Sequence, residues 1–237
     1  MNRIFFNLIV AFIIAAGGLL YAQSEDSFDI LQNREGGITI TGYTGSQKQV
    51  VIPERISGIP VTTIGKESFS GKELVQVTIP RTVTMIDEGA FADNNLTSLT
   101  IPEGVTVIWH RAFTNNQIAT ITLPRTLIRL GNYVFRGNRL TTVDLSVLSP
   151  SIDLLPEGTF LDNPLISINF GSITTITNLS IADVFRDAEN TTITTITIGS
   201  NVQMAAPGLE RNFINFYNSQ NKRAGTYIKN GRIWTIQ

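Results

Sequence analysis

Four phenylalanines recur at one constant step along the chain, and this spacing constrains the fold more than any other feature of the sequence. The phenylalanines are Phe69, Phe91, Phe113 and Phe135. Pairs of an apolar residue and a proline keep the same step, beginning at Ile79, Ile101 and Leu123, and Leu145 continues the series without a proline. Several anchors that recur together at one step indicate a chain built from stacked copies of one unit.

Each unit contains a short run with the spacing apolar-x-x-apolar-x-apolar. The clearest copy has Leu96, Leu99 and Ile101 at the apolar positions. A repeat of about 20–29 residues with this spacing is the signature of a leucine-rich-repeat solenoid. The sequence therefore predicts a mainly β solenoid with short helical turns on its convex side, in which residues 57–205 form about six coils.

Each coil is expected to have a strand that a proline ends, a second short extended segment, and a tight turn that carries the phenylalanine. Proline cannot donate a hydrogen bond to a strand ladder, so it terminates the strand. The phenylalanine is predicted to insert between coils, and burying such a side chain is worth about 1.5–3 kcal/mol. We expect one continuous core that buries a representative set of residues. These are Leu99, Ile101, Phe91, Phe113 and Ile121.

Asparagine follows each phenylalanine at a fixed short distance. The row consists of Asn94, Asn116, Asn138 and Asn163. Asparagine tolerates a left-handed backbone, and its amide can satisfy backbone groups in a loop. We interpret the row as structural and not as a ligand site. Phe160, Phe185 and Phe213 follow at longer steps, which predicts larger loops within the later coils.

The two ends of the solenoid need caps, because a terminal coil has no neighbour to cover its apolar face. We expect residues 23–56 to form the N-terminal cap, as a β-hairpin of 37–43 and 49–52. Residues 206–237 are expected to form the C-terminal cap, with a helix over 207–220 and a second hairpin. Asn230 and Gly231 would form the turn of that hairpin and place Tyr227 opposite Trp234.

Residues 1–22 have the pattern of a secretory signal peptide, with a charged start, an apolar run from Ile4 to Leu20 and a small residue, Ala22, before the expected cleavage point. An uncleaved anchor is the alternative, although the run is short for a membrane span.

Without Arg3 the mature chain would carry 17 basic and 19 acidic groups, a net charge of −2. This balance argues against nucleic acid as a partner.

Catalytic chemistry finds little support in the sequence. The chain has one histidine, His110, and no cysteine, and no Asp or Glu lies between Gly104 and Val143. A catalytic cluster could assemble only across coils. We therefore expect a monomeric protein that is not an enzyme, with no cofactor, no metal site and no membrane span after signal removal.

The isoleucine- or leucine-proline pair after the strand, together with Ala-Phe before an asparagine, resembles the BspA-like leucine-rich repeats of bacterial surface and secreted proteins. The similarity covers residues 37–200, and the C-terminal helix and hairpin resemble the ending of spirochaete members. In that family the asparagine position is often cysteine, and the period is usually slightly longer. The resemblance implies adhesion to host matrix proteins such as fibronectin or fibrinogen, and co-aggregation between bacteria.

One candidate binding surface is the outward side of the strands. Strand alternation should direct these side chains away from the core, and coils about 4.8 Å apart would make them one ordered polar sheet about six coils long. The candidate face consists of Gln76, Thr78, Ser98, Thr100, Thr120, Thr122, Thr142 and Asp144, continued by Ser167, Asn169, Thr195 and Thr197. The alternative is that threonine is simply a good exposed strand former.

Two further candidates are a basic patch and an aromatic anchor. The candidate basic patch is Arg111, Arg125, Arg129, Arg136 and Arg139. It could receive an anionic ligand, or it could be a solvated loop face that acids of neighbouring coils neutralise.

Trp109 lies at a position that other coils fill with Gly, Asp or Pro, so it is either an exposed anchor for a partner or a lid over its own coil.

These features together predict an exported binding module, periplasmic, secreted or at the cell surface, that recognises an extracellular protein or glycan. The alternative function is that of a structural scaffold in the periplasm or cell envelope.

Overall fold

The computed structural model describes residues 13–15, 18–20, 23–152, 154–177, 193–205, 211–230 and 233–237. Within the predicted signal peptide it describes β1 (Ile13–Ala15) and β2 (Gly18–Leu20), which pair with each other antiparallel. Phe185, residues 207–210 of the predicted C-terminal helix and Gly231 lie outside the described residues.

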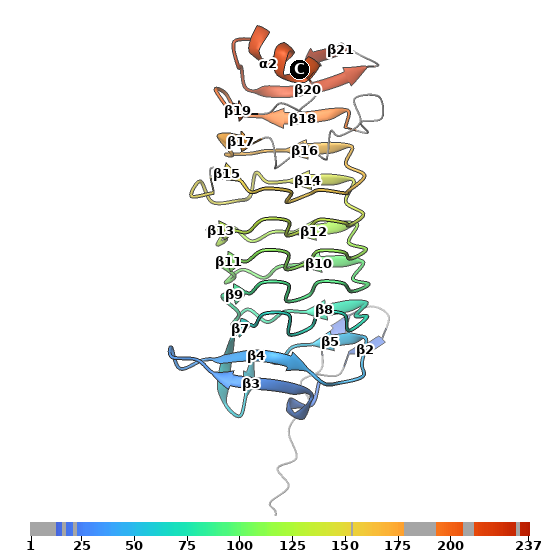
Figure 1. Ribbon diagram of the computed structural model, residues 1–237, viewed down its shortest axis with the longest axis vertical. Coiled ribbons are helices and arrows are strands. Elements are labelled where there is room, and N and C mark those ends of the chain that lie inside the picture. The colour runs from blue at the N-terminus through green and yellow to red at the C-terminus, as the bar shows by residue number, and fades with distance from the viewer. Residues whose placement is uncertain are drawn as a thin grey trace, which may run out of the picture.

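The chain winds into a solenoid whose coils stack along one axis, with strands on two sides (Figure 1). The first ladder consists of β5 (Gln49–Val51), β8 (Gln76–Thr78), β10 (Ser98–Thr100), β12 (Thr120–Thr122), β14 (Thr142–Asp144), β16 (Ser167–Asn169) and β18 (Thr195–Ile198). The second consists of β4 (Ile38–Tyr43), β7 (Ile59–Ile64), β9 (Met85–Ile86), β11 (Val107–Ile108), β13 (Arg129–Leu130), β15 (Leu154–Leu155), β17 (Thr175–Thr177) and β19 (Gln203–Ala205). The strands that pair within each ladder are parallel, which confirms the predicted solenoid.

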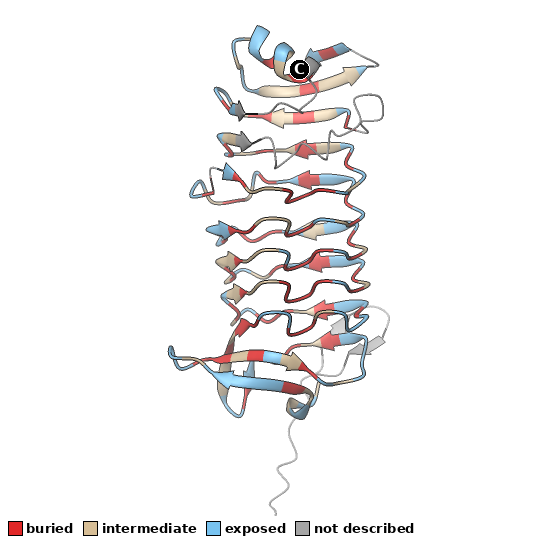
Figure 2. Ribbon diagram, viewed as in Figure 1, coloured by how far each residue is buried: buried red, intermediate tan, exposed pale blue. Residues whose placement is uncertain are grey.

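The strands pair in a register that matches the sequence repeat. Ser98 lies opposite Thr120, and Val107 lies opposite both Met85 and Arg129, so each residue meets its equivalent in the next coil. The middle residue of nearly every first-ladder strand points inward and is buried, as the red segments of Figure 2 show. One apolar core therefore runs the length of the stack.

The phenylalanine of each turn lies between the phenylalanines of the coils on either side. Successive rings are 5.0 to 5.8 Å apart and nearly parallel. The stack runs through Phe69, Phe91, Phe113, Phe135 and Phe160, and every one of these side chains is buried. The predicted insertion between coils is confirmed, and offset stacking of this kind adds to the burial of each ring.

The asparagine row satisfies backbone groups in the core. Asn116 Nδ2 donates to the carbonyls of Phe91, Phe113 and Thr114, and Asn116 Oδ1 accepts from the Leu96 amide at 3.1 Å. Asn94, Asn138 and Asn163 repeat the arrangement. The left-handed backbone belongs to the residue before the asparagine, as at Asn115 with φ of 54°, so the predicted conformational role was assigned one position too late.

Replacing Asn116 with alanine is expected to cost about 3 kcal/mol of stability, because a buried amide and several carbonyls would lose their partners at about 1–3 kcal/mol for each unsatisfied group. Urea unfolding measures the loss. Asn95→Ala is the matched control, since Asn95 is half-buried and its side chain accepts one hydrogen bond, from Gln117. Equal losses in the two variants would contradict the structural role of the row.

Both ladders are interrupted at one level. Among the described strands, β12 does not pair with β14, and β13 does not pair with β15, and Figure 1 shows a wider step there. The turns of the same two coils stay joined, since the Phe135 amide donates to the Thr159 carbonyl at 2.9 Å. The prediction that Ile121 is fully buried is wrong: this residue of β12, the strand that borders the interruption, is half-buried, whereas Val143 of β14 across the interruption is buried. The other representative core residues are buried.

The N-terminal hairpin differs from the predicted one. Residues 38–51 form the first coil, because β4 pairs in parallel with β7 and β5 pairs in parallel with β8. Tyr43 takes the phenylalanine position, and its ring stacks on Phe69 at 5.4 Å. The antiparallel partner of β4 is β3 (Phe28–Gln32), which follows the short helix η1 (Glu25–Ser27). A small hairpin, β6 (Arg55–Ile56) with the start of β7, precedes the next coil.

The C-terminal end is closed by α2 (Arg211–Ser219) and the hairpin of β20 (Gly225–Asn230) and β21 (Ile233–Ile236). β20 adds antiparallel to β18, so the hairpin extends the first ladder. Tyr227 lies opposite Ile236 and not opposite Trp234, which corrects the predicted register, because Asn230 is itself paired with Ile233. The shift is an even number of positions, so both rings remain on one face and pack against Phe213, at 5.5 and 4.8 Å.

Candidate functional site

The outward side of the first ladder is a polar surface over its central coils. Thr78 is half-buried there, and the other central candidates are exposed. The exposed positions are Gln76, Ser98, Thr100, Thr120, Thr122, Thr142 and Asp144. In the later coils Ser167, Asn169, Thr195 and Thr197 are half-buried, and the hydroxyl of Thr197 lies 3.0 Å from that of Thr226 in the C-terminal hairpin.

This polar face is not the single sheet that the sequence predicted. The first ladder is divided into three sheets, β5–β8, β10–β12, and β14 through β21. The interruption at β12 and β14 coincides with a longer coil, since Phe160 follows Phe135 at a longer step than the one that joins the earlier phenylalanines. The most regular part of the face is therefore the pair β10 and β12, where Thr100 lies opposite Thr122.

The threonine hydroxyls on this face differ in their hydrogen bonding from those of threonines beside the second ladder. Thr84 and Thr106, which precede strands of the second ladder, direct their hydroxyls to the carbonyls of Thr62 and Thr84, both at 3.2 Å. Within the part of the chain that the structure describes, the hydroxyls of Thr100 and Thr122 make no such bond. They are exposed donors and acceptors that remain available to another molecule.

The five arginines do not form one basic patch. Each coil runs once around the solenoid, so residues a few positions apart face different directions. Arg111 and Arg136 lie together at a hollow on the turns, while Arg129 belongs to the second ladder and Arg125 to the loop after β12. Arg139, exposed before β14, is the fifth member.

Acidic side chains of neighbouring coils contact two of these arginines. Arg136 Nε is 2.9 Å from an Asp162 carboxylate oxygen. The Glu103 carboxylate accepts from the Arg125 backbone amide at 3.1 and 3.2 Å. This arrangement favours the solvated loop face over a dedicated polyanion site.

Trp109 is half-buried on the outward side of the second ladder. Its Nε1 donates to Met85 Sδ at 3.3 Å, and the Arg129 guanidinium lies 5.3 Å from the ring centroid. The indole thus has its polar atom and part of its face covered by its own protein. The geometry favours the lid over the anchor.

His110 also has a local structural role. Its Nδ1 accepts from the Asn132 backbone amide at 2.9 Å. Across the described residues, no three His, Asp or Glu side chains come together in a way that could hold a metal ion.

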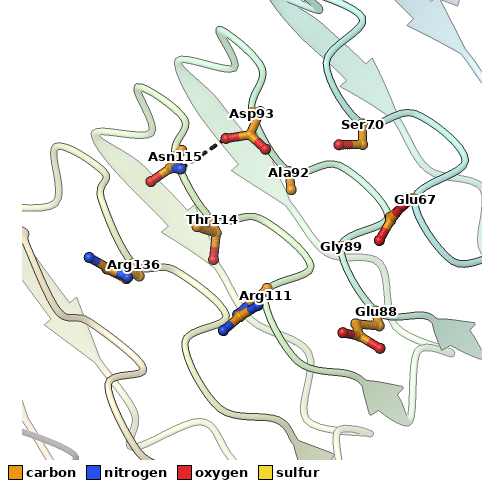
Figure 3. Close-up of a pocket in the computed structure, with 10 residues that line it drawn as sticks. All are labelled: Glu67, Ser70, Glu88, Gly89, Ala92, Asp93, Arg111, Thr114, Asn115 and Arg136. Atoms are coloured by element: carbon orange, nitrogen blue, oxygen red, sulfur yellow. Dashed lines mark hydrogen bonds between the residues drawn. The ribbon is translucent and has the colours of Figure 1, made fainter.

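The turn side carries a hollow that the sequence prediction missed (Figure 3). Its volume is about 550 Å³, and it crosses the turns of several successive coils. Glu67 and Glu88 lie on one side, Arg111 and Arg136 lie on the other, and Gly89 lies between them. The sequence does contain a pattern that could have predicted this hollow. Equivalent positions of three successive repeats hold an acid, a glycine without a side chain, and a base: Glu67, Gly89 and Arg111.

Two charges of this hollow are tethered within the protein. Lys66 Nζ is 3.0 Å from the Glu88 carboxylate. The hydrogen bond and charge of Lys66 lower the pKa of Glu88, with smaller contributions from His110 and Arg111, and Glu88 in turn raises the pKa of Lys66. The Glu88 carboxylate therefore stays ionised at neutral pH. At the rim, Asn115 Nδ2 donates to Asp93 Oδ1 at 2.8 Å.

Comparison with known proteins agrees with this architecture. A family model described as BspA type leucine-rich repeat region matches residues 62–190 in six copies. A leucine-rich-repeat protein of T. pallidum is 25% identical over 78% of this chain and 81% of that chain, with a TM-score of 0.60. One from Bacteroides capillosus is 25% identical over 49% of this chain and 91% of that chain, with a TM-score of 0.44. No curated protein matches the sequence.

A repeat fold of this kind is typical of non-enzymatic protein-interaction modules. In the part of the chain that the structure describes, no helix has the length and apolar character needed to cross a bilayer.

Proposed function

Because the chain belongs to the BspA-type leucine-rich-repeat family, we propose that it is an exported binding module that recognises a protein or glycan outside the cytoplasm. The proposal includes adhesion to host matrix proteins, which the resemblance in sequence implies. It applies to a protein at the cell surface or released from the cell.

The observation that carries this proposal is the set of free hydroxyls on β10 and β12. Thr100 and Thr122 are exposed and adjacent in register, and neither side chain has a hydrogen-bond partner among the described residues. The backbones of these two strands pair with each other, so their outward side chains can bind a ligand without disturbing that pairing. Neutral hydroxyls of this kind suit an uncharged polar surface on the ligand, and the affinity of such a contact should change little with salt concentration.

Replacing Thr100 and Thr122 together with lysine is expected to weaken binding to immobilised fibronectin or fibrinogen at least tenfold, because two like charges would stand about 5 Å apart where neutral hydroxyls were. Titration on a biosensor surface measures the change. The matched control is Thr84→Lys with Thr106→Lys, which has the same residue type and the same repeat step but lies at the other ladder. Both variants are compared with the unmodified protein at low and at physiological salt.

Three outcomes separate the possibilities. Loss in the β10–β12 variant alone supports the strand face. If both double variants bind fibronectin or fibrinogen as the unmodified protein does, the strand face is excluded. If the unmodified protein binds immobilised heparin instead, and loses that binding at physiological salt, the arginines are the better candidates. Protease accessibility on intact cells tests export to the surface, and protection of the protein there would favour the scaffold role in the periplasm or envelope.

A further inference from the structure

We infer that the hollow on the turn side is a second recognition site, which takes a bipolar segment of a partner protein, one that presents a cationic and an anionic group about two coil steps apart. This inference rests on the proposed function as a binding module and adds the chemistry of one contact. The hollow lies on the turns and not on either strand ladder, so it is independent of the strand face.

The hollow is open because small residues occupy its middle. Gly89 has a φ of 60°, and a Cβ at that position would come within 3.1 Å of Glu67 Cγ. Other coils place Glu67, Arg111 and Tyr133 at the equivalent position with nearly the same φ, from 53° to 58°. A side chain is therefore tolerated by this turn, and its absence at position 89 leaves the space between Glu67 and Arg111 unfilled.

The walls carry opposite charges that remain apart. Figure 3 shows the Glu67 and Glu88 carboxylates on one side and the Arg111 and Arg136 guanidinium groups on the other. Glu88 and Arg136 have ion-pair partners outside the hollow. Within the described residues, Glu67 and Arg111 form no ion pair, and the Arg111 guanidinium lies 6.0 Å from the centroid of the Tyr133 ring. One anion and one cation are thus available on opposite sides of the same hollow.

The spacing of these two groups defines the ligand. Glu67 and Arg111 occupy the same position in coils two steps apart, and two strand spacings correspond to about 10 Å. A segment with a Lys or Arg directed to Glu67 and an Asp or Glu directed to Arg111 would match both walls. A polyanion would meet the carboxylates of Glu67, Glu88 and Asp93, and a polycation would meet the two arginines, so ligands of a single sign are disfavoured.

The remaining lining supports a peptide over a bare ion. The buried Thr114 already donates its hydroxyl to the Tyr133 carbonyl at 2.6 Å, but Ser70 and Asn115 add a hydroxyl and an amide to the lining. These two groups can bond to the backbone of a bound segment. Glu67 and Arg111 are both exposed, so binding should be weak for an isolated site. It should weaken further as ionic strength rises to physiological levels, where the screening length is about 8 Å.

The test uses ω-amino acids, from γ-aminobutyrate to aminooctanoate, as bipolar probes of graded length, with octylamine and octanoate as single-charge controls. Binding is followed through the amide NMR signals of Gly89 and Ala92 in the full chain. We expect the longer ω-amino acids to bind and the single-charge compounds to bind at least fivefold more weakly. Glu67→Gln and Arg111→Gln should each weaken aminooctanoate binding about five- to tenfold, the effect of one exposed charged contact.

Matched control variants distinguish loss of the binding site from a general effect on the fold. Glu35→Gln and Arg81→Gln remove exposed charges elsewhere and should leave probe binding and the NMR spectrum unchanged. If octanoate or octylamine binds as well as aminooctanoate, or if Glu67→Gln and Arg111→Gln bind like the unmodified protein, the inference is overturned. The Thr100→Lys, Thr122→Lys variant should still bind the probes, so failure of the strand face and failure of the hollow give different results.

Discussion

A chain that ends at residue 224 is expected to aggregate under conditions in which the full chain remains in solution. The truncation removes β20 and β21 and exposes the edge of β18, with which β20 pairs along its length. It also uncovers Phe213, which packs against Tyr227 and Trp234. An unpaired strand edge beside exposed aromatic rings is a template for association between copies.

Light scattering during size-exclusion chromatography measures this outcome. Ile233→Ala is the control on the same hairpin, since that side chain is 69% exposed and its loss should change little. A second variant, Trp234→Ala in the full chain, keeps the strands but removes an aromatic contact, and should lower stability by about 3–5 kcal/mol. If the truncated chain elutes as the full chain does and unfolds at the same temperature, the hairpin is not a cap.

Replacing Phe113 with alanine is expected to destabilise the protein by about 3–5 kcal/mol, the range for a buried aromatic truncated in a rigid core. The Phe113 side chain has 0% exposure, and its ring lies 5.3 Å from Phe91 and 5.8 Å from Phe135. Backbone hydrogen bonds join the neighbouring coils around the ring, so they cannot easily collapse into the cavity. The stack therefore loses two ring contacts at once.

Urea unfolding followed by far-ultraviolet circular dichroism measures the effect. Ile128→Ala is the control from the adjacent coil, because Ile128 is 55% exposed and its truncation should stay within about 0.5 kcal/mol. A loss for Phe113→Ala as small as that of the control would contradict the assigned role of the stack.

The sequence by itself determined the interior of the repeats. The constant repeat step makes equivalent residues meet, so Leu99, Phe91 and Phe113 could be placed in the core and the asparagine row could be assigned to the backbone. These features are local and repeated, and each copy supports the same conclusion. The inward and outward positions of the strands followed from alternation in the same way.

The ends of the solenoid were decided by tertiary structure. An alternating strand, a turn and a second strand are compatible both with a hairpin and with the two arms of a coil. Residues 38–51 adopt the coil, because parallel pairing with β7 and β8 places Tyr43 on Phe69 and buries Val50. No short-range pattern distinguishes the two, since the partner strands lie a full repeat further along the chain.

The candidate sites were likewise decided by how the coils stack. The five arginines are close in sequence but face different sides, because one repeat makes a full circuit of the solenoid. Ile121 is half-buried at the level where both ladders are interrupted, and that interruption depends on how a longer coil fits its neighbour. The hollow exists only because Gly89 lies between Glu67 and Arg111 when their turns are stacked. Charge and shape at a surface of this kind are properties of neighbours in space, which only the folded chain brings together.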